Sequence, residues 1–133
     1  MLKKPITYID YNGNQRTENF WFGLDEAEIL EFQMSYPGGM TAMLEKMIEE
    51  QDGAKILETI KKVIMMAHGE KSVDGKYFKK SKEMSEAFTH TRAYSVLLME
   101  LYSGGAAEFM NKIIPQVPNQ TTDTPQIIVP EAQ

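Results

Sequence analysis

The 133-residue chain contains no cysteine, only two histidines and only two arginines. The absence of cysteine excludes disulfide bonds, thiolate zinc sites and thiol catalysis, and it suits a reducing compartment. No apolar run approaches the ~20 residues of a membrane span, and none near Met1 is long enough for a signal sequence. Hydrophobic residues make up 42% of the chain and charged residues 25%, which is typical of a globular protein. We therefore expect a soluble, intracellular protein.

Catalytic and ligand-binding motifs are also scarce. His68 and His90 lack the spacing of a metal-binding pair such as H-x-x-x-H. The stretch HGEKSVDGKYFKK contains Gly-x-Lys-Ser, but a Walker loop requires a second glycine directly before the lysine and a strand before the loop. His68 stands at the end of a predicted helix, where we interpret it as a residue that compensates the helix dipole. The sequence thus predicts no cofactor, no metal and no catalytic residue.

The net charge of −5 conceals one basic segment. Residues 61–82 carry seven Lys/Arg against two Asp/Glu, whereas residues 1–60 carry five against eleven and residues 83–133 carry two against six. Such a division favours head-to-tail self-association or an oppositely charged partner. Solvated helix faces are the simpler explanation for most of these charges.

The N-terminal segments ITYIDY and RTENFWF are rich in β-branched and aromatic residues and flank Asn12-Gly13, which predicts a β-hairpin over residues 5–22. A two-residue turn at this point pairs Ile9 with Arg16. It places Ile9 and Tyr11 on one face with Phe20 and Phe22, and Ile6, Tyr8 and Trp21 on the other. Because an isolated two-stranded ribbon is barely stable, one face is expected to pack on helices.

About five helices are predicted within residues 25–114, separated by glycine and proline signals. Asp25 and Glu28 have the spacing of a capping box, and Asp52 and Ser81 are predicted to be further N-caps. The predicted fold class is mainly α (α+β), with an N-terminal β-hairpin packed on a bundle of about five helices and a disordered C-terminal tail.

The lysine-rich stretch is predicted to connect two of these helices. Gly69 ends the helix before it as a C′ residue, and Asp74-Gly75 forms a tight turn within it. A single helix then runs from Ser81 to a break at Gly104-Gly105. The connection is therefore expected to be a hairpin-like loop, with Tyr77 or Phe78 burying at least one ring.

Residues 1–115 are expected to form a single globular domain, followed by a flexible, proline-rich tail over residues 116–133. The last nineteen residues hold four of the six prolines and no lysine or arginine. Ile127-Ile128-Val129 is the one apolar island in this tail.

Methionine is unusually frequent, with ten residues, nine of them in or beside predicted helices. Core filling is the ordinary interpretation of any single methionine. The alternative is that some line a groove for a partner's helix, because flexible methionine side chains repack around varied apolar partners. The candidate partner-binding residues are Met40, Met43, Met47, Met65, Met66 and Trp21.

The order of these features resembles that of the tail assembly chaperones of long-tailed bacteriophages that infect Gram-positive hosts. The resemblance covers residues 5–115, from ITYIDYNGNQRTENFWF through LDEAEILEFQMSYPGG to AAEFMNKIIP. Its most specific part comprises Gly69, Lys71, Ser72, Asp74, Gly75, Phe78 and Lys80, then Ser85-Glu86-Ala87-Phe88, Ala93-Tyr94 and Ile113-Ile114-Pro115.

The resemblance implies a non-enzymatic role in tail assembly. It implies that the chain binds the tape-measure protein, keeps it soluble and helps recruit the major tail (tube) protein. It also implies action in the host bacterial cytoplasm and absence from the mature virion. We expect self-association as well, and neither a nucleic-acid nor a membrane partner.

Two other classes of function stay open. A small phage or bacterial nucleic-acid-binding regulator would use the basic segment 61–82, although the chain is acidic overall and matches no nucleic-acid-reading motif. An enzyme is the second alternative, although the sequence shows no set of nucleophile, base and orienting group.

Overall fold

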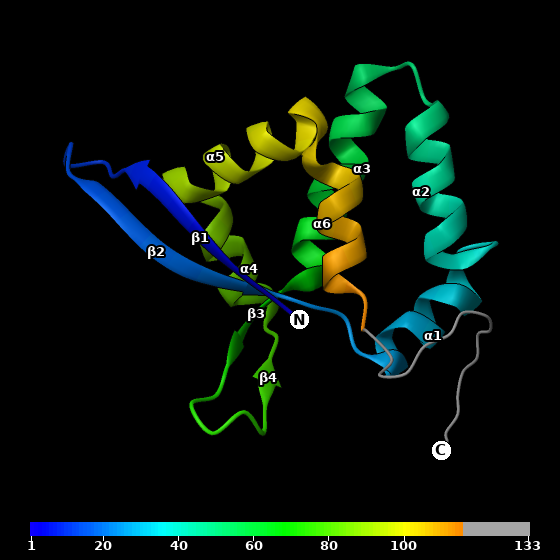
Figure 1. Ribbon diagram of the computed structural model, residues 1–133, viewed down its shortest axis with the longest axis horizontal. Coiled ribbons are helices and arrows are strands. Elements are labelled where there is room, and N and C mark those ends of the chain that lie inside the picture. The colour runs from blue at the N-terminus through cyan, green and yellow to red at the C-terminus, as the bar shows by residue number, and fades with distance from the viewer. Residues whose placement is uncertain (116–133) are drawn as a thin grey trace.

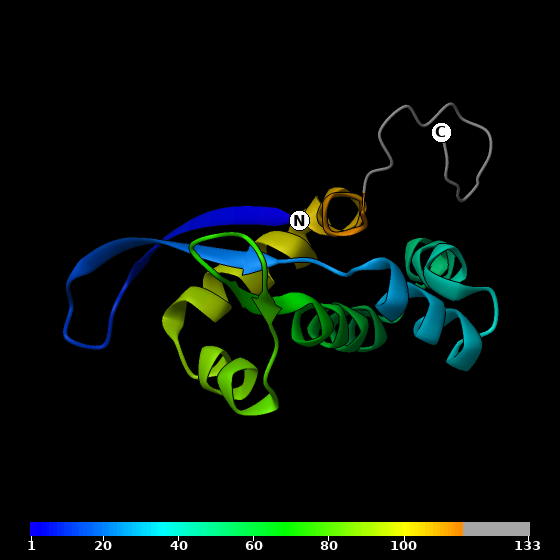
Figure 2. The same cartoon turned by 90° about the horizontal axis from the view of Figure 1, so that it is seen from below.

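The computed structural model describes residues 1–115, which form an α+β fold dominated by helices. Its elements are β1 (Leu2–Ile9), β2 (Gln15–Phe22), α1 (Glu26–Ser35), α2 (Gly39–Glu49), α3 (Gly53–Ala67), β3 (His68–Lys71), β4 (Phe78–Lys79), α4 (Lys82–Thr89), α5 (Arg92–Glu100), the kinked segment η1 (Leu101–Gly105) and α6 (Ala106–Ile113). The β1–β2 hairpin and the α1–α2 pair project from opposite sides of α3 (Figure 1 and Figure 2). The predicted fold class is confirmed for these residues, and the predicted tail lies outside them.

The turn of the N-terminal hairpin is one residue longer than the predicted turn. The Asp10 N–H donates to the Asn14 carbonyl (2.8 Å), and the Gly13 N–H donates to the Asp10 carbonyl (2.9 Å). Gly13 adopts a φ of 85°, so the loop is a three-residue turn with a left-handed last residue. The Asp10 carboxylate stabilises this turn by accepting from the N–H groups of Asn12 and Asn14.

The longer turn shifts the pairing of β1 with β2 by one residue, so each residue of β1 shares a face with the other alternate set of β2 residues than predicted. Ile9 pairs with Gln15 and not with Arg16. A one-residue shift moves every side chain to the other face, so the predicted face that joins Ile9 and Tyr11 to the phenylalanines is wrong. The side chains that contribute to the core or pack against it are Leu2, Ile6, Tyr8, Phe20 and Phe22.

The predicted hairpin-like connection is a β-hairpin that extends the N-terminal sheet. The four strands follow the order β1-β2-β3-β4, and every neighbouring pair is antiparallel. Gly69 directly follows the C-cap residue of α3, as predicted. It lies within β3, however, and does not adopt the left-handed backbone conformation that is typical of a C′ glycine. A Cβ at this position would lie 2.8 Å from the Lys79 carbonyl oxygen and 2.8 Å from the Phe78 ring, so the close approach of β4 requires glycine.

The three predicted N-caps are confirmed. Asp25 and Glu28 form a reciprocal capping box at the start of α1. Asp52 accepts a hydrogen bond from Ala54 N–H at the start of α3, and Ser81 begins α4 in the same manner. These polar residues satisfy backbone donors that a helix start would otherwise leave unpaired.

The single helix predicted from Ser81 to Gly104 is two helices. Thr91 begins α5, because its hydroxyl accepts from Tyr94 N–H (3.2 Å) while donating to the Phe88 carbonyl (2.8 Å). At the predicted break, Gly104 adopts a φ of 135° inside η1, and α6 follows. The described residues therefore contain six α-helices, close to the predicted number of about five.

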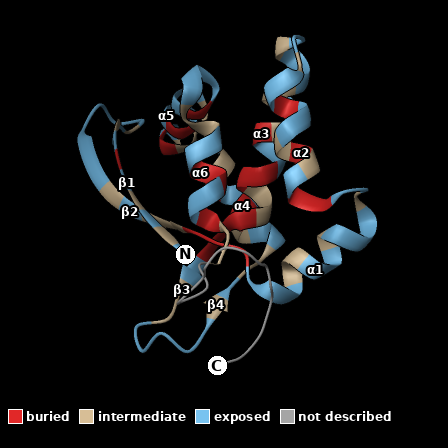
Figure 3. Cartoon of the chain, turned by 45° about the vertical axis from the view of Figure 1, so that its right-hand side comes forward, coloured by how far each residue is buried: buried red, intermediate tan, exposed pale blue. Residues whose placement is uncertain are grey.

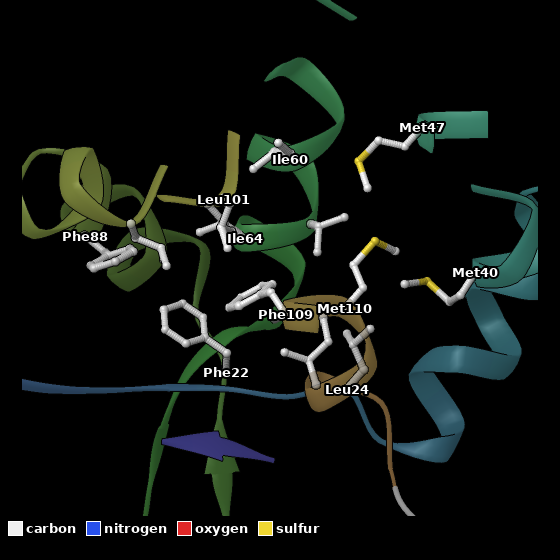
Figure 4. Packing of buried hydrophobic residues seen from close by; sticks show 14 of the residues in the cluster. Phe22, Leu24, Met40, Met47, Ile60, Ile64, Phe88, Leu101, Phe109 and Met110 are labelled. Carbon is white, nitrogen blue, oxygen red and sulfur yellow. The ribbon is translucent and has the colours of Figure 1, made fainter. Parts of the chain in front are cut away.

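The core lies where α3, α5, α6 and the sheet meet. Buried residues line the inward sides of these elements, whereas α1 contains none (Figure 3). Phe22 from β2 makes edge contacts with Phe88 at 5.9 Å and Phe109 at 5.3 Å between ring centroids, and Figure 4 shows these rings together. Packing of this kind fixes the positions of the surface residues described below.

Candidate partner-binding surface

The candidate methionines of α2 lie in the core. Met40, Met43 and Met47 have exposed fractions of 7%, 3% and 9%. In Figure 4, Met40 and Met47 extend from α2 toward Met110 of α6. Their helical stripe therefore holds α2 to the body, and contact of these three side chains with a partner stays a prediction that requires α2 to move.

A hollow of about 280 Å³ lies between α2 and α3. Met43 and Met47 contribute to its lining, together with lysines of both helices, Glu58 of α3 and Glu50, the C-cap residue of α2. Because both signs of charge surround it, this hollow favours neither an acidic nor a basic partner.

The other two candidate methionines line a larger hollow of about 380 Å³, which we call the methionine hollow. Met65 and Met66 are half-buried residues at the end of α3. The complete lining is Lys62, Met65, Met66, Lys80, Ser81, Lys82 and Ser85. It contains three lysines and no carboxylate, so the hollow combines an apolar methionine surface with a basic rim.

Lys80 fixes one side of this rim. Its Nζ atom donates to both carboxylate oxygens of Glu28 on α1 (2.8 and 2.7 Å) and to the Met66 carbonyl (2.9 Å). The β3–β4 hairpin returns the chain to this point, and Ser81 then begins α4 beside the end of α3. Lys80, from the segment between β4 and α4, thus joins α1 to the end of α3 beside the hollow.

Lys62 and Lys82 complete the rim and form no salt bridge within residues 1–115. Unpaired cations beside apolar surface attract an acidic, amphipathic partner more than a neutral one. The sequence candidates did not include these lysines, although the basic segment 61–82 contains all of them and is the signal that indicates them.

Behind the hollow, His68 is a core residue and not a solvent-exposed helix terminus. It has an exposed fraction of 6%, and its ring stacks on Phe88 with centroids 4.6 Å apart. Its Nδ1 atom lies 3.1 Å from the hydroxyl oxygen of Ser85. Burial lowers the pKa of His68, and the nearby Glu70 opposes this effect. The interpretation of His68 as a dipole-compensating cation is therefore wrong.

Trp21 lies away from the methionine hollow. It is half-buried, and the amines of Lys3 and Lys71 lie 5.8 and 5.2 Å from its ring centroid. The strand register puts Trp21 on the sheet face opposite Phe20 and Phe22. Trp21 is not part of the lining of the methionine hollow, and partner binding by Trp21 stays a prediction.

The described residues show two further properties of the surface. No group of three or more His, Cys, Asp or Glu in residues 1–115 is arranged to hold a metal ion. Over the same residues, each helix is too short or too polar to cross a membrane.

Comparison with known proteins identifies the family. No significant match was found among curated proteins, and none among solved structures. A sequence model described as phage tail assembly chaperone matches residues 1–131. That match spans nearly the whole chain, so the protein belongs to the phage tail assembly chaperone family.

Proposed function

We propose that this chain binds the tape-measure protein through the methionine hollow and keeps it soluble while the tail is built. The observation that carries the proposal is membership of the tail assembly chaperone family. The hollow supplies a location, since it is apolar, basic at its rim and about 380 Å³ in volume. That volume falls within the range of ordinary binding pockets, about 300–1,000 Å³.

The chemistry of the hollow suits a helical client with apolar and acidic residues. Met65 and Met66 adapt their shape to different side chains, so one hollow accepts many positions along a repetitive client. Lys62 and Lys82 orient the client by attracting its carboxylates. Contacts of this kind need no reactive group, and the proposed role is non-catalytic.

A client-solubility assay tests this proposal. Purified tape-measure fragment is diluted from denaturant with and without this chain, and light scattering is recorded. Wild type is expected to suppress scattering at near-stoichiometric amounts, and Met65→Gln is expected to require several-fold more protein. Met99→Gln is the matched control, because Met99 is 69% exposed on α5 outside the hollow. Equal precipitation of the fragment with and without wild type would refute the proposal.

Recruitment of tube subunits is the second part of the proposed function. The chain is proposed to bind the major tail protein while it holds the tape-measure protein, and protein partners in the tail follow from the family. Size-exclusion chromatography of the three proteins together is expected to show one ternary peak. Elution of the tube protein apart from the other two would refute the proposed recruitment of tube subunits without affecting the proposal that the chain binds its client.

The proposed site of action is the host cytoplasm before the tail is complete. We propose that the chain leaves once its client is enclosed, so mass spectrometry of purified virions is expected to detect the tape-measure protein without this chain. Stoichiometric recovery of the chain from virions would show that it is a structural component instead.

A further inference from the structure

The outward face of α1 carries an apolar stripe between acidic residues. Leu30 and Met34 are 53% and 80% exposed, and Ala27 lies in line with them at helical spacing. Consecutive residues of an α-helix are rotated by about 100° around its axis. This rotation places Glu26 on one side of the stripe and Glu31 on the other. We call these five residues the acidic stripe.

The opposite face of α1 attaches this helix to the body. Ile29, Phe32 and Tyr36 pack against the core cluster, and Glu28 binds Lys80 at the rim of the methionine hollow. The acidic stripe therefore points away from the hollow of its own chain. Within residues 1–115, the side chains of Leu30 and Met34 have no packing partner in the core.

The acidic stripe and the methionine hollow are complementary in two independent respects. Each has two or three apolar side chains at its centre, the stripe is bordered by Glu26 and Glu31, and the charged residues that line the hollow are lysines, of which Lys80 is paired with Glu28. Glu26 and Glu31 match Lys62 and Lys82, which lack carboxylate partners within the described chain. The exposed face of α2 is a weaker match, because Ile48 is its only large exposed hydrophobic residue.

We propose that the acidic stripe of one copy of this chain occupies the methionine hollow of a second copy. The contact joins two different surfaces, so it is heterologous and adds copies head to tail. This inference rests on the proposed function, because the hollow is also the proposed client site. The acidic stripe then occupies the place of the client: it covers Met65 and Met66 when no client is present, and it is displaced when the client binds.

Charge reversal tests the self-contact without any client. Sedimentation velocity of wild type is expected to show association that grows with protein concentration and weakens at 0.5 M salt. Glu26→Lys with Glu31→Lys and, separately, Lys62→Glu with Lys82→Glu are each expected to weaken association at least tenfold. An equimolar mixture of the two double variants is expected to associate again. The stripe and the hollow are both basic in the first variant and both acidic in the second, so each stripe meets a hollow of opposite charge on the other variant.

The matched control is Glu45→Lys with Glu49→Lys. It makes the same change of net charge on the exposed face of α2, and it is expected to associate as wild type does. Thermal melts by circular dichroism confirm that each variant is folded. Monomeric wild type at all concentrations, loss of association in the α2 control, or no recovery in the mixture would each overturn the proposal.

Competition distinguishes this inference from the proposed function. Addition of tape-measure fragment is expected to dissociate the wild-type assemblies, and the Glu26→Lys, Glu31→Lys variant is expected to bind the fragment at least as tightly as wild type. Client binding that leaves the assemblies intact would overturn the inference and spare the proposed function. Intact self-association without any client binding would refute the proposed function and spare the self-contact.

Discussion

The imidazole of His68 is buried beside the rings of Phe22 and Phe88, and we expect this position to make the stability of the fold depend on pH. Burial lowers the pKa of His68 in the folded chain, whereas the unfolded chain titrates near the ordinary value of about 6.5. As the pH falls below that value, the unfolded chain binds a proton that the folded chain does not bind. The contribution of His68 to the free energy of unfolding is therefore largest above pH 6.5. It decreases as the pH is lowered from 6.5 to the pKa of His68 in the folded chain.

We expect the urea concentration at the midpoint of denaturation to decrease when the pH is lowered from 7.5 to 5.5. Asp10 and Asp74 do not contribute, because hydrogen bonds from Arg16 and from the Lys76 backbone lower their pKa values and keep them ionised in this window. His68→Phe is expected to flatten the pH dependence, whereas Ser85→Ala retains it. An equal fall in wild type and His68→Phe would show that another group is responsible.

Gly69 occupies a position in the lysine-rich hairpin that has no room for a side chain. An added Cβ would meet backbone of β4 and the Phe78 ring. Gly69→Ala is therefore expected to lower the free energy of unfolding by about 1–3 kcal/mol, as overpacking does elsewhere. Gly75→Asn is the control, because Gly75 has open space around it and a φ of 79° that asparagine tolerates. A chemical denaturation series that finds the two variants equally stable would contradict this account.

At the scale of the element, Thr91 decides where one helix ends and the next begins. The apolar positions of α4 and α5 continue one helical pattern, so periodicity alone predicts a single helix. The signal for the break is the Thr91 hydroxyl, which hydrogen-bonds backbone on both sides. A local side-chain cap therefore overrides the longer pattern.

Thr91→Ala is expected to destabilise the fold by about 1 kcal/mol, the usual effect of removing an N-cap. Thr91→Ser keeps the hydroxyl and is expected to retain most of the stability. Ser95→Ala, at an exposed position later in α5, is expected to be nearly neutral. Urea denaturation of the three variants checks this order, and a neutral Thr91→Ala would show that packing alone sets the helix boundary.

The N-terminal hairpin shows how a correct element prediction can carry a wrong register. Asn12-Gly13 correctly predicts a turn, but Asp10 adds side-chain hydrogen bonds that start the turn one residue earlier. The competing loops differ by a single residue in length. Strand composition does not discriminate between them, because both faces of the hairpin carry aromatic residues.

For the whole molecule, the sequence predicts the element order well and the functional surface only in part. Caps, glycines and amphipathic stripes are local signals, so the helices, the N-terminal hairpin and the lysine-rich connection follow from them. The methionine hollow depends on long-range packing, because Glu28 of α1 and Met66 of α3 both bind Lys80, which lies between β4 and α4. Counting methionines therefore indicates Met65 and Met66 without separating them from the buried methionines of α2.

The central claim is that this chaperone works through an adaptable surface at the methionine hollow. Hydrogen–deuterium exchange of the full chain, with and without a tape-measure fragment, tests that claim most directly. We predict slower exchange at residues 62–66 and 80–85 when the fragment is bound, with the tip of the β1–β2 hairpin unchanged. A bound fragment that slows exchange only at the hairpin or elsewhere, and leaves those two segments unaffected, would contradict it.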